Sequence, residues 1–286
     1  CGKTKVTIDL IQNRKHDTVL ILCPKSVIDT WVEEYPKHAA DGVPVHIEAC
    51  NKGTVKQKKE AAEVAMIQAR ATGKRFICVI NYESAWRKPF GDWAKKAGFD
   101  LVVCDESHKI KSPSGKASRF AEAIGKVVPY RLALTGTPMP NDPLDVYGQY
   151  RFLDRAIFGT NHSEFKTRYA IWKKFDNGGE KAVRFINQEE LNQKMYSIAI
   201  RYDSDDVLDL PEAVHMQRYT ELEPKAKRFY KEMEKEFYAE VDEGEVTAAN
   251  AAVKILRMMQ VTSGQVKDDN GDLREVSVAK KKLLDE

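Results

Sequence analysis

Three short segments of the sequence combine residue types whose chemistry acts on phosphates. The first is Gly2-Lys3-Thr4, and a helical pattern follows it at once. At a helix N-terminus, backbone N–H groups and the helix dipole hold a phosphate, a lysine reaches its β and γ oxygens, and a hydroxyl binds magnesium. The tripeptide alone also fits an ordinary helix start, because the first glycine of a phosphate-binding loop and the strand before it are absent.

The second segment is a pair of acids at the end of an apolar run. Leu101–Cys104 are apolar, Asp105 and Glu106 follow directly, and His108 comes two residues later. Parallel sheets place ligand-binding groups at the carboxyl ends of their strands. One acid there can hold a magnesium shell, and its neighbour can orient a water for in-line attack on a γ-phosphate. The same pair also fits a turn or a helix cap.

The third segment, Arg131–Pro138, is again a strand pattern that ends in a polar turn. If its strand lies next to the one before Asp105, the hydroxyls of Thr135 and Thr137 can meet His108. Gly136 by itself fits a simple turn equally well. The three segments in this order are hard to obtain by chance, and we interpret them as parts of one nucleotide site.

The elements that must position these segments alternate between strands and helices over the first 150 residues. Continuous hydrophobic strands, separated by helix-length segments, are typical of a parallel sheet covered on both faces. The sequence therefore predicts an α/β, doubly wound architecture. Strands are expected at Thr18–Cys23, Val43–Ala49, Phe76–Asn81, Asp100–Cys104 and Arg131–Thr135, and helices at Lys5–Asn13, Val27–His38, Val55–Ala71 and Ser114–Gly125.

The pattern changes after residue 143. Residues 144–200 are aromatic-rich and predict mostly helix, interrupted by a turn at Asn177–Gly179. A strand is expected at Val214–Thr220, followed by a helix that Pro224 opens and whose apolar residues recur at i, i+4. Its apolar face is Phe229, Met233, Phe237 and Val241, and the Asp268–Asp272 stretch marks a turn between two short β-like runs.

The composition bounds the class of protein. Of the 286 residues 42% are apolar and 31% charged, which excludes a disordered polyelectrolyte, and no apolar run approaches the roughly 18 residues of a membrane span. The 46 Lys+Arg against 43 Asp+Glu leave +3, too little to argue for nucleic acid. The five cysteines form no Cys-x-x-Cys pair, so we expect buried thiols in a reducing cell interior. The start is not a signal peptide and looks cut.

With these motifs in this order, the chain resembles helicase superfamily two, specifically its Swi/Snf-type, chromatin-remodeller-like ATPases, over nearly its whole length. The extended form of the acidic motif, with Lys109-Ile110-Lys111, favours this branch over other helicases. Ser107 stands where Gly or Ala is more usual, a change that we expect to be tolerated. The similar stretches are Ile21–Trp31 (motif Ia), Val79–Glu83 (Ib), Asp105–Lys111 (II), Leu134–Pro138 with Asn141 (III), Ile200–Glu212 and Leu256–Gln260.

The resemblance implies a role for each matched position. Gly2, Lys3 and Thr4 would bind ATP, Thr4 and Asp105 would hold Mg²⁺, and Glu106 would activate the attacking water. A coupling group would link nucleotide state to DNA contact: His108, Thr135, Gly136 and Thr137. A DNA track would supply backbone N–H and hydroxyl donors to one strand: Pro24, Lys25, Ser26, Asn81, Tyr82, Glu83, Ser84 and Lys111.

The implied protein is an intracellular ATP-dependent translocase on double-stranded DNA, in cytoplasm, nucleoid or nucleus, without a membrane partner. Its fold would be a RecA-like P-loop NTPase lobe (1–143) with a helical insertion (144–200) and a return strand and helices (201–286). A second RecA-like lobe, which carries arginines of the ATP site, would be missing, so this chain should bind nucleotide weakly and hydrolyse it very slowly. The absence of the strand normally found before Gly2 would leave a gap or unpaired edges in the sheet.

Two other function classes fit parts of the sequence. A non-hydrolysing DNA-binding or scaffold module would keep the fold without the activity, although the intact Lys3, Asp105 and Glu106 argue against it. An RNA helicase or a restriction-type motor would share the same motifs.

Several further residues have ordinary structural explanations. Asp203, Asp205, Asp206 and Asp209 fit caps and loops better than a metal cluster. The four tryptophans are expected in the core rather than stacked on bases. One helical segment carries four cations beside acids and is expected to be a solvated face: Lys56, Lys58, Lys59 and Arg70.

Overall fold

A computed structural model describes residues 2–40, 42–175, 178–202, 216–236, 238–241, 244–247 and 251–285. The chain divides into two compact units, Cys1–Leu208 and Asp209–Glu286, and each has its own buried hydrophobic cluster. The four aspartates at 203–209 and residues 203–212 of the motif stretch Ile200–Glu212 lie outside the described residues. Among the helices that the structure describes, none has the length and apolar character needed to cross a membrane.

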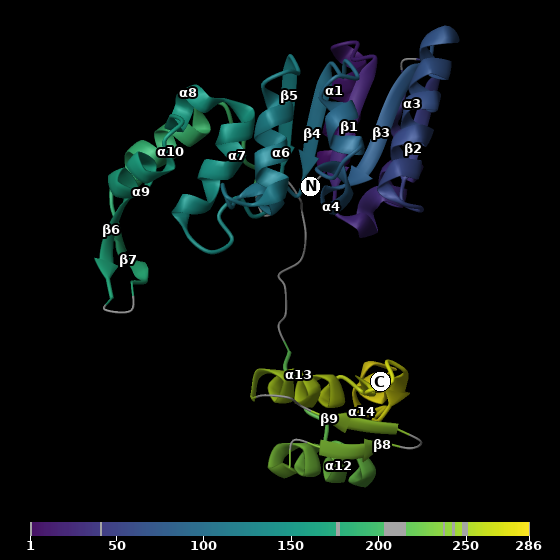
Figure 1. The fold of residues 1–286 in the computed structure, drawn as a ribbon, viewed down its shortest axis with the longest axis vertical. Helices are drawn as coiled ribbons and strands as arrows, with labels where there is room; N and C mark the ends of the chain where they lie inside the picture. The colour runs from purple at the N-terminus through teal and green to yellow at the C-terminus, as the bar shows by residue number, and fades with distance from the viewer. Residues whose placement is uncertain are drawn as a thin grey trace. The chain divides into compact units, whose positions relative to one another are not determined.

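The first unit is built on a five-stranded sheet in the order β2-β3-β1-β4-β5 (Figure 1). All four neighbouring pairs are parallel, and β4 hydrogen-bonds to β1 on one side and β5 on the other. Of the two expected outcomes, a gap or unpaired edges, no gap lies between the described strands, because β4 and β5 pair directly. β5 is an edge strand that pairs with β4 alone among them. The strands are β1 (Thr18–Cys23), β2 (Val45–Cys50), β3 (Arg75–Asn81), β4 (Leu101–Asp105) and β5 (Tyr130–Leu134).

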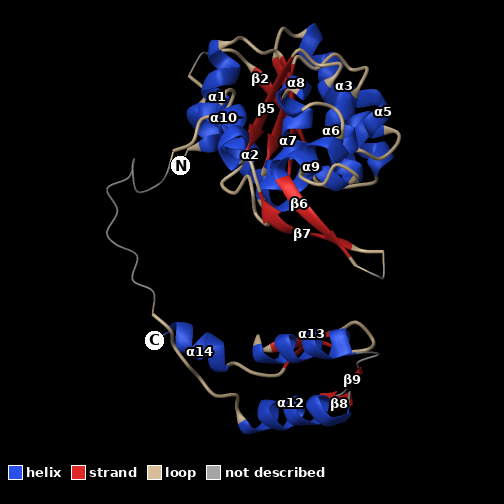
Figure 2. Ribbon diagram, turned by 90° about the vertical axis from the view of Figure 1, so that its left-hand side faces the viewer, coloured by secondary structure: helices blue, strands red, loops and turns tan. Residues whose placement is uncertain are grey.

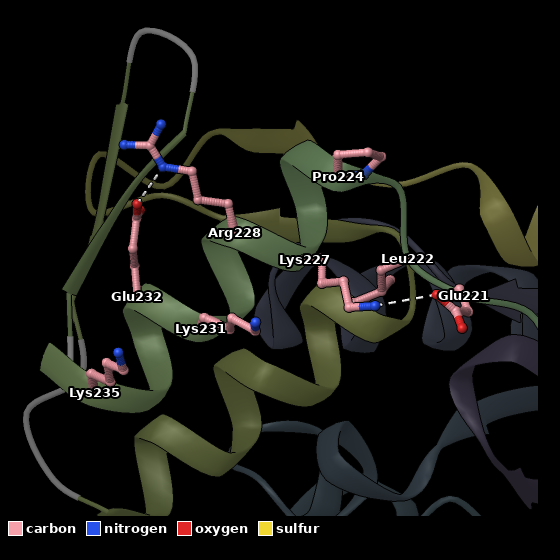
Figure 3. Close-up of a pocket in the computed structure, with 8 residues that line it drawn as sticks. All are labelled: Glu221, Leu222, Pro224, Lys227, Arg228, Lys231, Glu232 and Lys235. Atoms are coloured by element: carbon pink, nitrogen blue, oxygen red, sulfur yellow. Dashed lines mark hydrogen bonds and ion pairs between the residues drawn. The ribbon is translucent and has the colours of Figure 1, made fainter.

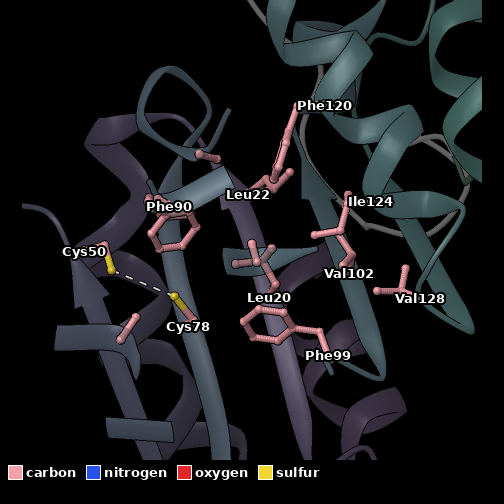
Figure 4. Packing of buried hydrophobic residues seen from close by; sticks show 14 of the residues in the cluster. Leu20, Leu22, Cys50, Cys78, Phe90, Phe99, Val102, Phe120, Ile124 and Val128 are labelled. Carbon is pink, nitrogen blue, oxygen red and sulfur yellow. Dashed lines mark hydrogen bonds between the residues drawn. The ribbon is translucent and has the colours of Figure 1, made fainter. Parts of the chain in front are cut away.

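Helices cover both faces of this sheet, as the continuous apolar strands predict. Leu20 and Val102 point to the face covered by α3 to α6 (Figure 4), whereas Ile21 and Val103 point to the face covered by α1 and α2. Each fully buried aliphatic side chain contributes about 1.5–3 kcal/mol, so packing on two faces fixes the strands firmly. The helices are α1 (Lys3–Asn13), α2 (Ile28–His38), α3 (Val55–Ala71), α4 (Tyr82–Ala85), α5 (Phe90–Ala94) and α6 (Lys116–Gly125).

Residues 143–200 contain helices and also a β-hairpin that the sequence analysis did not predict. The two strands, β6 (Ala170–Lys174) and β7 (Glu180–Phe185), pair antiparallel across the turn predicted at 177–179 (Figure 2). A turn was expected here, and the N–H of Gly178 bonds the carbonyl of Phe175, but the residues on either side of it were assigned to helix. Ile171 and Trp172 instead pair with Arg184 and Ala182 across the two strands. The helices are α7 (Val146–Leu153), α8 (Arg155–Phe158), α9 (His162–Tyr169) and α10 (Gln188–Tyr196).

A close backbone approach fixes α7 against the segment that follows β4. A Cβ added to Gly148 would lie 2.2 Å from the carbonyl oxygen of Ile110 and 2.5 Å from that of Lys111. Any larger residue would push α7 away from the short 3₁₀ helix η2 (Ser107–Ile110). The glycine therefore holds the acidic motif and α7 in direct contact.

The second unit is formed by α12 (Pro224–Glu236), α13 (Ala251–Thr262), α14 (Ala279–Asp285) and two hairpins. Pro224 opens α12 as predicted, but the helix ends at Glu236, and Val241 lies in β8 (Tyr238–Val241), which pairs with β9 (Gly244–Thr247). Met216–Thr220 has no regular structure, so the described part of the strand expected at Val214–Thr220 is not a strand. The predicted β-like runs form β10 (Gln265–Lys267) and β11 (Leu273–Glu275).

Candidate functional site

The predicted site residues lie at one edge of the sheet, where the parallel strands end. Asp105 is the last residue of β4, Asn81 the last residue of β3, and Pro24 follows β1 directly. Lys3 is the first residue of α1, and its side chain extends to this edge of the sheet. Its ammonium nitrogen lies 3.2 Å from Glu106 Oε1. The geometry brings together groups that are 103 residues apart in sequence.

The contact between Lys3 and Glu106 is open to solvent on one side. The two side chains are 37% and 31% exposed. A Cβ added to Gly136 would lie 3.8 Å from Lys3 Nζ, so the turn after β5 passes beside the same ammonium group. Gly2 directly precedes helix α1, has φ +67° and supplies no side chain to cap the first turn. The backbone donors of that turn are therefore available to an anion.

Asp105 is the buried acid of the pair. Its side chain accepts a hydrogen bond from Trp31 Nε1 at 3.0 Å and one from the backbone N–H of Glu106 at 3.0 Å, and the residue is 6% exposed. Burial raises the pKa of the Asp105 carboxyl above its usual range, against the lowering effect of the Trp31 hydrogen bond. Trp31 is in the core, as expected, but it also orients this carboxylate.

Glu106 is held in an uncommon backbone conformation. Its φ of +51° lies in the left-handed region, which a side chain rarely adopts. This turn directs Glu106 Oε1 to Lys3 and Oε2 to His108 Nδ1 at 3.3 Å. His108 Nδ1 also lies 3.4 Å from Thr135 Oγ1, which accepts a hydrogen bond from the N–H of Thr137. The predicted coupling residues are thus in a row beside the acid.

Thr4 is not drawn into these contacts. It lies in the first turn of α1 next to Lys3, and among the described residues no hydrogen bond joins it to Asp105. No group of three or more His, Cys, Asp or Glu side chains in the described part of the chain could hold a metal ion. One carboxylate and one hydroxyl are nevertheless a usual protein contribution to Mg²⁺, which takes its other oxygens from phosphates and water.

A buried amide, which the sequence analysis missed, joins two of the motifs. Gln149 of α7 accepts a hydrogen bond from Ser107 Oγ at 2.7 Å and donates through Nε2 to the carbonyl of Pro138 at 2.6 Å and of Asp145 at 3.1 Å. Ser107 is fully buried, and Gln149 is 3% exposed. The serine that departs from the usual Gly or Ala therefore has a dedicated partner. The available signal was a polar residue between Tyr147 and Tyr150, two aromatic residues of α7.

The segment predicted as motif Ib rests on a second buried group. Lys58 of α3 is 7% exposed, and its ammonium donates to Asn81 Oδ1 at 3.3 Å and Ser84 Oγ at 3.1 Å. The prediction that Lys58 lies on a solvated face of α3 is therefore wrong. Burial lowers the pKa of Lys58 from its usual value, and the nearby charge of Lys25 lowers it further. Glu83 beside it accepts from Asn81 Nδ2 at 2.7 Å.

The other residues predicted to contact DNA differ in exposure and in whether their side chains already have a partner. Lys25 and Ser26 are exposed in the 3₁₀ turn η1 (Lys25–Val27) that follows β1. Tyr82 is buried, and its hydroxyl donates to the backbone carbonyl of Asp105 at 2.7 Å. Lys111 forms an ion pair with Asp145 at 3.0 Å. Tyr82 therefore acts within the fold, and the charge of Lys111 is already balanced.

A pocket in the second unit lies on α12 and is lined only by residues between Glu221 and Lys235 (Figure 3). None of the site residues described above belongs to this segment. The pocket has a volume of about 610 Å³, and several of its charges are neutralised locally. Lys227 pairs with Glu221 at 3.2 Å, and Arg228 pairs with Glu232 at 2.7 Å. Because none of the phosphate-binding or acidic motifs line it, we do not assign it as the nucleotide site.

Comparison with known proteins identifies the family. The SNF2-related domain matches residues 1–270. The chain belongs to the SNF2-related domain family. Putative protein p41 of Acyrthosiphon pisum secondary endosymbiont phage 1 is 28% identical over 99% of this chain and 63% of its own length. The human DNA repair and recombination protein RAD54-like is 28% identical over 62% of this chain and 23% of its own length.

A solved structure supports the fold of this SNF2-related domain. The Sulfolobus solfataricus SWI2/SNF2 ATPase core in complex with dsDNA has a TM-score of 0.50 and 22% identity, covering 91% of this chain and 51% of that one. The predicted RecA-like α/β fold and the Swi/Snf-type resemblance are confirmed. The chain spans less than two thirds of the length of these relatives.

The buried bridge between Ser107 and Gln149 predicts a pairwise effect on stability. Gln149→Leu should lower the free energy of unfolding by about 1–3 kcal/mol, because it leaves the Ser107 hydroxyl buried without a partner. The double variant Ser107→Ala with Gln149→Leu should recover the part of that loss that comes from the Ser107 hydroxyl, whereas the part that comes from the Pro138 carbonyl remains. Denaturant unfolding of the two single variants, the double variant and the wild type measures this cycle. Additive losses in the double variant would contradict a direct bridge.

The buried ammonium of Lys58 predicts a change of stability with pH. Its folded pKa lies below the usual 10.5, so between the two values the unfolded chain binds more protons and the folded state gains stability as the pH rises. Lys58→Met should remove this part of the rise, because methionine fills similar space without titrating. The test is to measure the unfolding free energies of the wild type and of Lys58→Met from neutral pH to pH 10.5. The contributions of the other titrating groups cancel when the two curves are subtracted. Equal slopes for both proteins would disprove the assignment.

Proposed function

We propose that this SNF2-related domain is the N-terminal ATPase lobe of an ATP-dependent translocase on double-stranded DNA. The observation that supports the proposal most directly is the meeting of Lys3 with Glu106, beside the buried Asp105, at the carboxyl edge of the sheet. A phosphate-binding lysine, a metal-binding acid and a water-orienting acid are the groups that phosphoryl transfer to water requires. The names of the relatives, which include an ATP-dependent helicase from yeast and DNA repair proteins, agree with it.

The side chains divide the reaction between them. In the absence of nucleotide, the Lys3 ammonium contacts the Glu106 carboxylate at 3.2 Å. When nucleotide binds, Lys3 leaves Glu106 and contacts the β and γ phosphates. Glu106 then orients a water and accepts its proton as the water oxygen bonds to the γ-phosphorus. The bond from that phosphorus to the bridging oxygen breaks, and ADP and phosphate leave. His108 contacts both Glu106 and Thr135, so it can transmit the change at Glu106 to the turn after β5.

The donor set fits a magnesium ion. Asp105 is a carboxylate whose pKa burial holds above its usual range, so a nearby divalent cation would favour its ionised form. Thr4 adds a hydroxyl at the first turn of α1. Bound there, Mg²⁺ would neutralise charge on the transferring phosphate. Trp31 keeps one oxygen of Asp105 engaged, which leaves the carboxylate oriented rather than free to rotate.

The proposed DNA track follows the ends of β1 and β3. Pro24, Lys25 and Ser26 come after β1, and Asn81 and Ser84 come at the end of β3, the neighbouring strand. Such backbone and hydroxyl donors contact phosphates without reading sequence. The buried ammonium of Lys58 positions the last two side chains. Lys111 joins the track only when its pair with Asp145 opens.

The central test is the glutamate that would activate water. In the complete protein, Glu106→Gln should lower DNA-stimulated ATP hydrolysis by about 10²–10⁴-fold, as expected for loss of a general base, while nucleotide binding is retained. Glu33→Gln is the matched control, because this exposed glutamate of α2 takes part in none of the site contacts. Phosphate release should be stimulated more by duplex DNA than by single strands or RNA. Unchanged turnover in Glu106→Gln would favour a non-hydrolysing module, and preferential stimulation by RNA would favour an RNA helicase.

We also propose that the chain 1–286 has little activity by itself. The side chains of Lys3 and Glu106 are about one third exposed, so water reaches the γ-phosphate position from the open side, where a second lobe would close the site. Nucleotide should bind weakly and hydrolyse very slowly in this chain compared with a protein that carries both lobes. Fluorescent-nucleotide titration and phosphate release with added DNA measure this. Turnover equal to that of the two-lobed protein would contradict it.

A further inference from the structure

The β6–β7 hairpin carries a concentration of positive charge that the proposed ATP site and DNA track do not use. It extends away from helices α8 to α10 of the first unit in both views (Figures 1 and 2). One of its faces packs inward, and Trp172 on this face is half-buried. Trp172 Nε1 donates to the backbone carbonyl of Lys166 at 3.1 Å, and the Lys166 ammonium lies 3.9 Å from the centroid of the indole ring. Residues paired directly across a hairpin share a face, so Ala182 opposite Trp172 lies on the same side.

The other face is exposed and cationic. Lys173 is paired directly with Lys181, and Ile171 is paired with Arg184. All four are exposed, and the three cations form no ion pair with any residue that the structure describes. The described acid of the hairpin, Glu180, is instead bound by Lys166. Among the described residues, this face therefore presents three positive charges without a compensating acid.

The Lys173–Lys181 pair opposes the stability of the hairpin. Like charges directly opposite each other in an antiparallel pair repel, whereas an acid at either position would attract. A two-stranded hairpin is marginal to begin with, so this arrangement is costly for the fold. A bound polyanion would remove the repulsion, because its charges would lie between or beside the two ammonium groups.

We propose that the exposed face of the β6–β7 hairpin is a second docking surface for duplex DNA, which it binds through backbone phosphates at Lys173, Lys181 and Arg184. The inference rests on the proposed function, since it assumes that duplex DNA is the partner. Two-stranded ribbons fit the major groove, and lysines beside it contact phosphates without reading sequence. Figure 1 shows the arrowheads of β3 and β4 and the hairpin directed toward the same side of the first unit, so one duplex can approach both.

A second copy of the chain fits this face less well. Ile171 is 46% exposed on this face and could pack against an apolar partner. An identical face would, however, bring three further cations against the first three. Lysines on exposed strands are a usual means of preventing such strand-to-strand association. The charge therefore favours a polyanion, and the Ile171 side chain would lie against sugars or base edges.

The test distinguishes an effect on folding from an effect on DNA binding. Lys181→Glu should stabilise the hairpin and weaken its binding to DNA. Lys181→Glu creates a Lys–Glu cross-strand pair, so the hairpin should be at least as stable, while affinity for a mixed-sequence duplex should fall. The double variant Lys173→Glu with Lys181→Glu should weaken binding further and make the slope of log K against log[salt] less steep by about 1.8, at about 0.9 for each phosphate that is no longer neutralised. Thermal unfolding and fluorescence anisotropy at several salt concentrations, without nucleotide, give both readouts.

The matched control changes the same charge at the other end of the sheet. Lys74 and Lys96 are exposed, precede β3 and β4, and so lie at the amino ends of the strands. Lys74→Glu with Lys96→Glu should leave the salt slope unchanged. Equal loss in both double variants would mean that only net charge matters and would overturn the proposal. Self-association of the wild type that disappears in the hairpin variant would overturn it in favour of a second copy.

The failure of this inference differs from failure of the proposed function. If the wild-type chain binds duplex and the hairpin variants bind it equally well, only the docking surface is wrong. If no duplex binding occurs at low salt, and duplex does not stimulate ATP hydrolysis by the complete protein, the proposed function itself fails. ATP hydrolysis without DNA should be unchanged in the hairpin variants, because none of these residues contacts the ATP site.

Discussion

The contact between the Lys3 ammonium and the Glu106 carboxylate, 3.2 Å apart, depends on the position of one strand. β4 is hydrogen-bonded on both sides and packed on both faces, and these contacts fix the position of its carboxyl end. Helix α1 is held against one of those faces by Ile8 and Ile11. These two packed elements bring the basic and acidic groups together, and the coupling residues follow the ends of β4 and of its neighbour β5.

Several arrangements at this edge cost stability and are maintained by the surrounding fold. Burial disfavours the charged form of Asp105 and of Lys58, and Glu106 has a left-handed backbone conformation. Strain and buried charge of this kind persist where the rest of the structure determines the position, and they often mark functional sites. The neighbouring apolar strands supply that constraint, since each fully buried aliphatic side chain contributes about 1.5–3 kcal/mol.

The two buried polar contacts were not predictable from local pattern. Gln149 meets Ser107 across 42 residues, and Lys58 meets Asn81 across 23, so neither pair has a spacing that a single helix or strand would indicate. Lys58 lies among other cations and acids, which is why the sequence predicted a solvated face. The hairpin at 170–185 and the end of α12 at Glu236 were missed for a related reason: short apolar runs fit either helix or strand until their partners are known.

The sequence by itself determined the five strands, the four longer helices up to Gly125, the α/β class and the residues of the three motifs, because these follow from local periodicity and residue type. It did not predict the short helices α4 and α5. Only the tertiary structure decided that β4 and β5 pair directly, that Glu106 bridges Lys3 and His108, and that Lys173 faces Lys181. Contacts between distant segments depend on how whole elements pack, and packing is set by the combined burial of many side chains rather than by any one stretch of sequence.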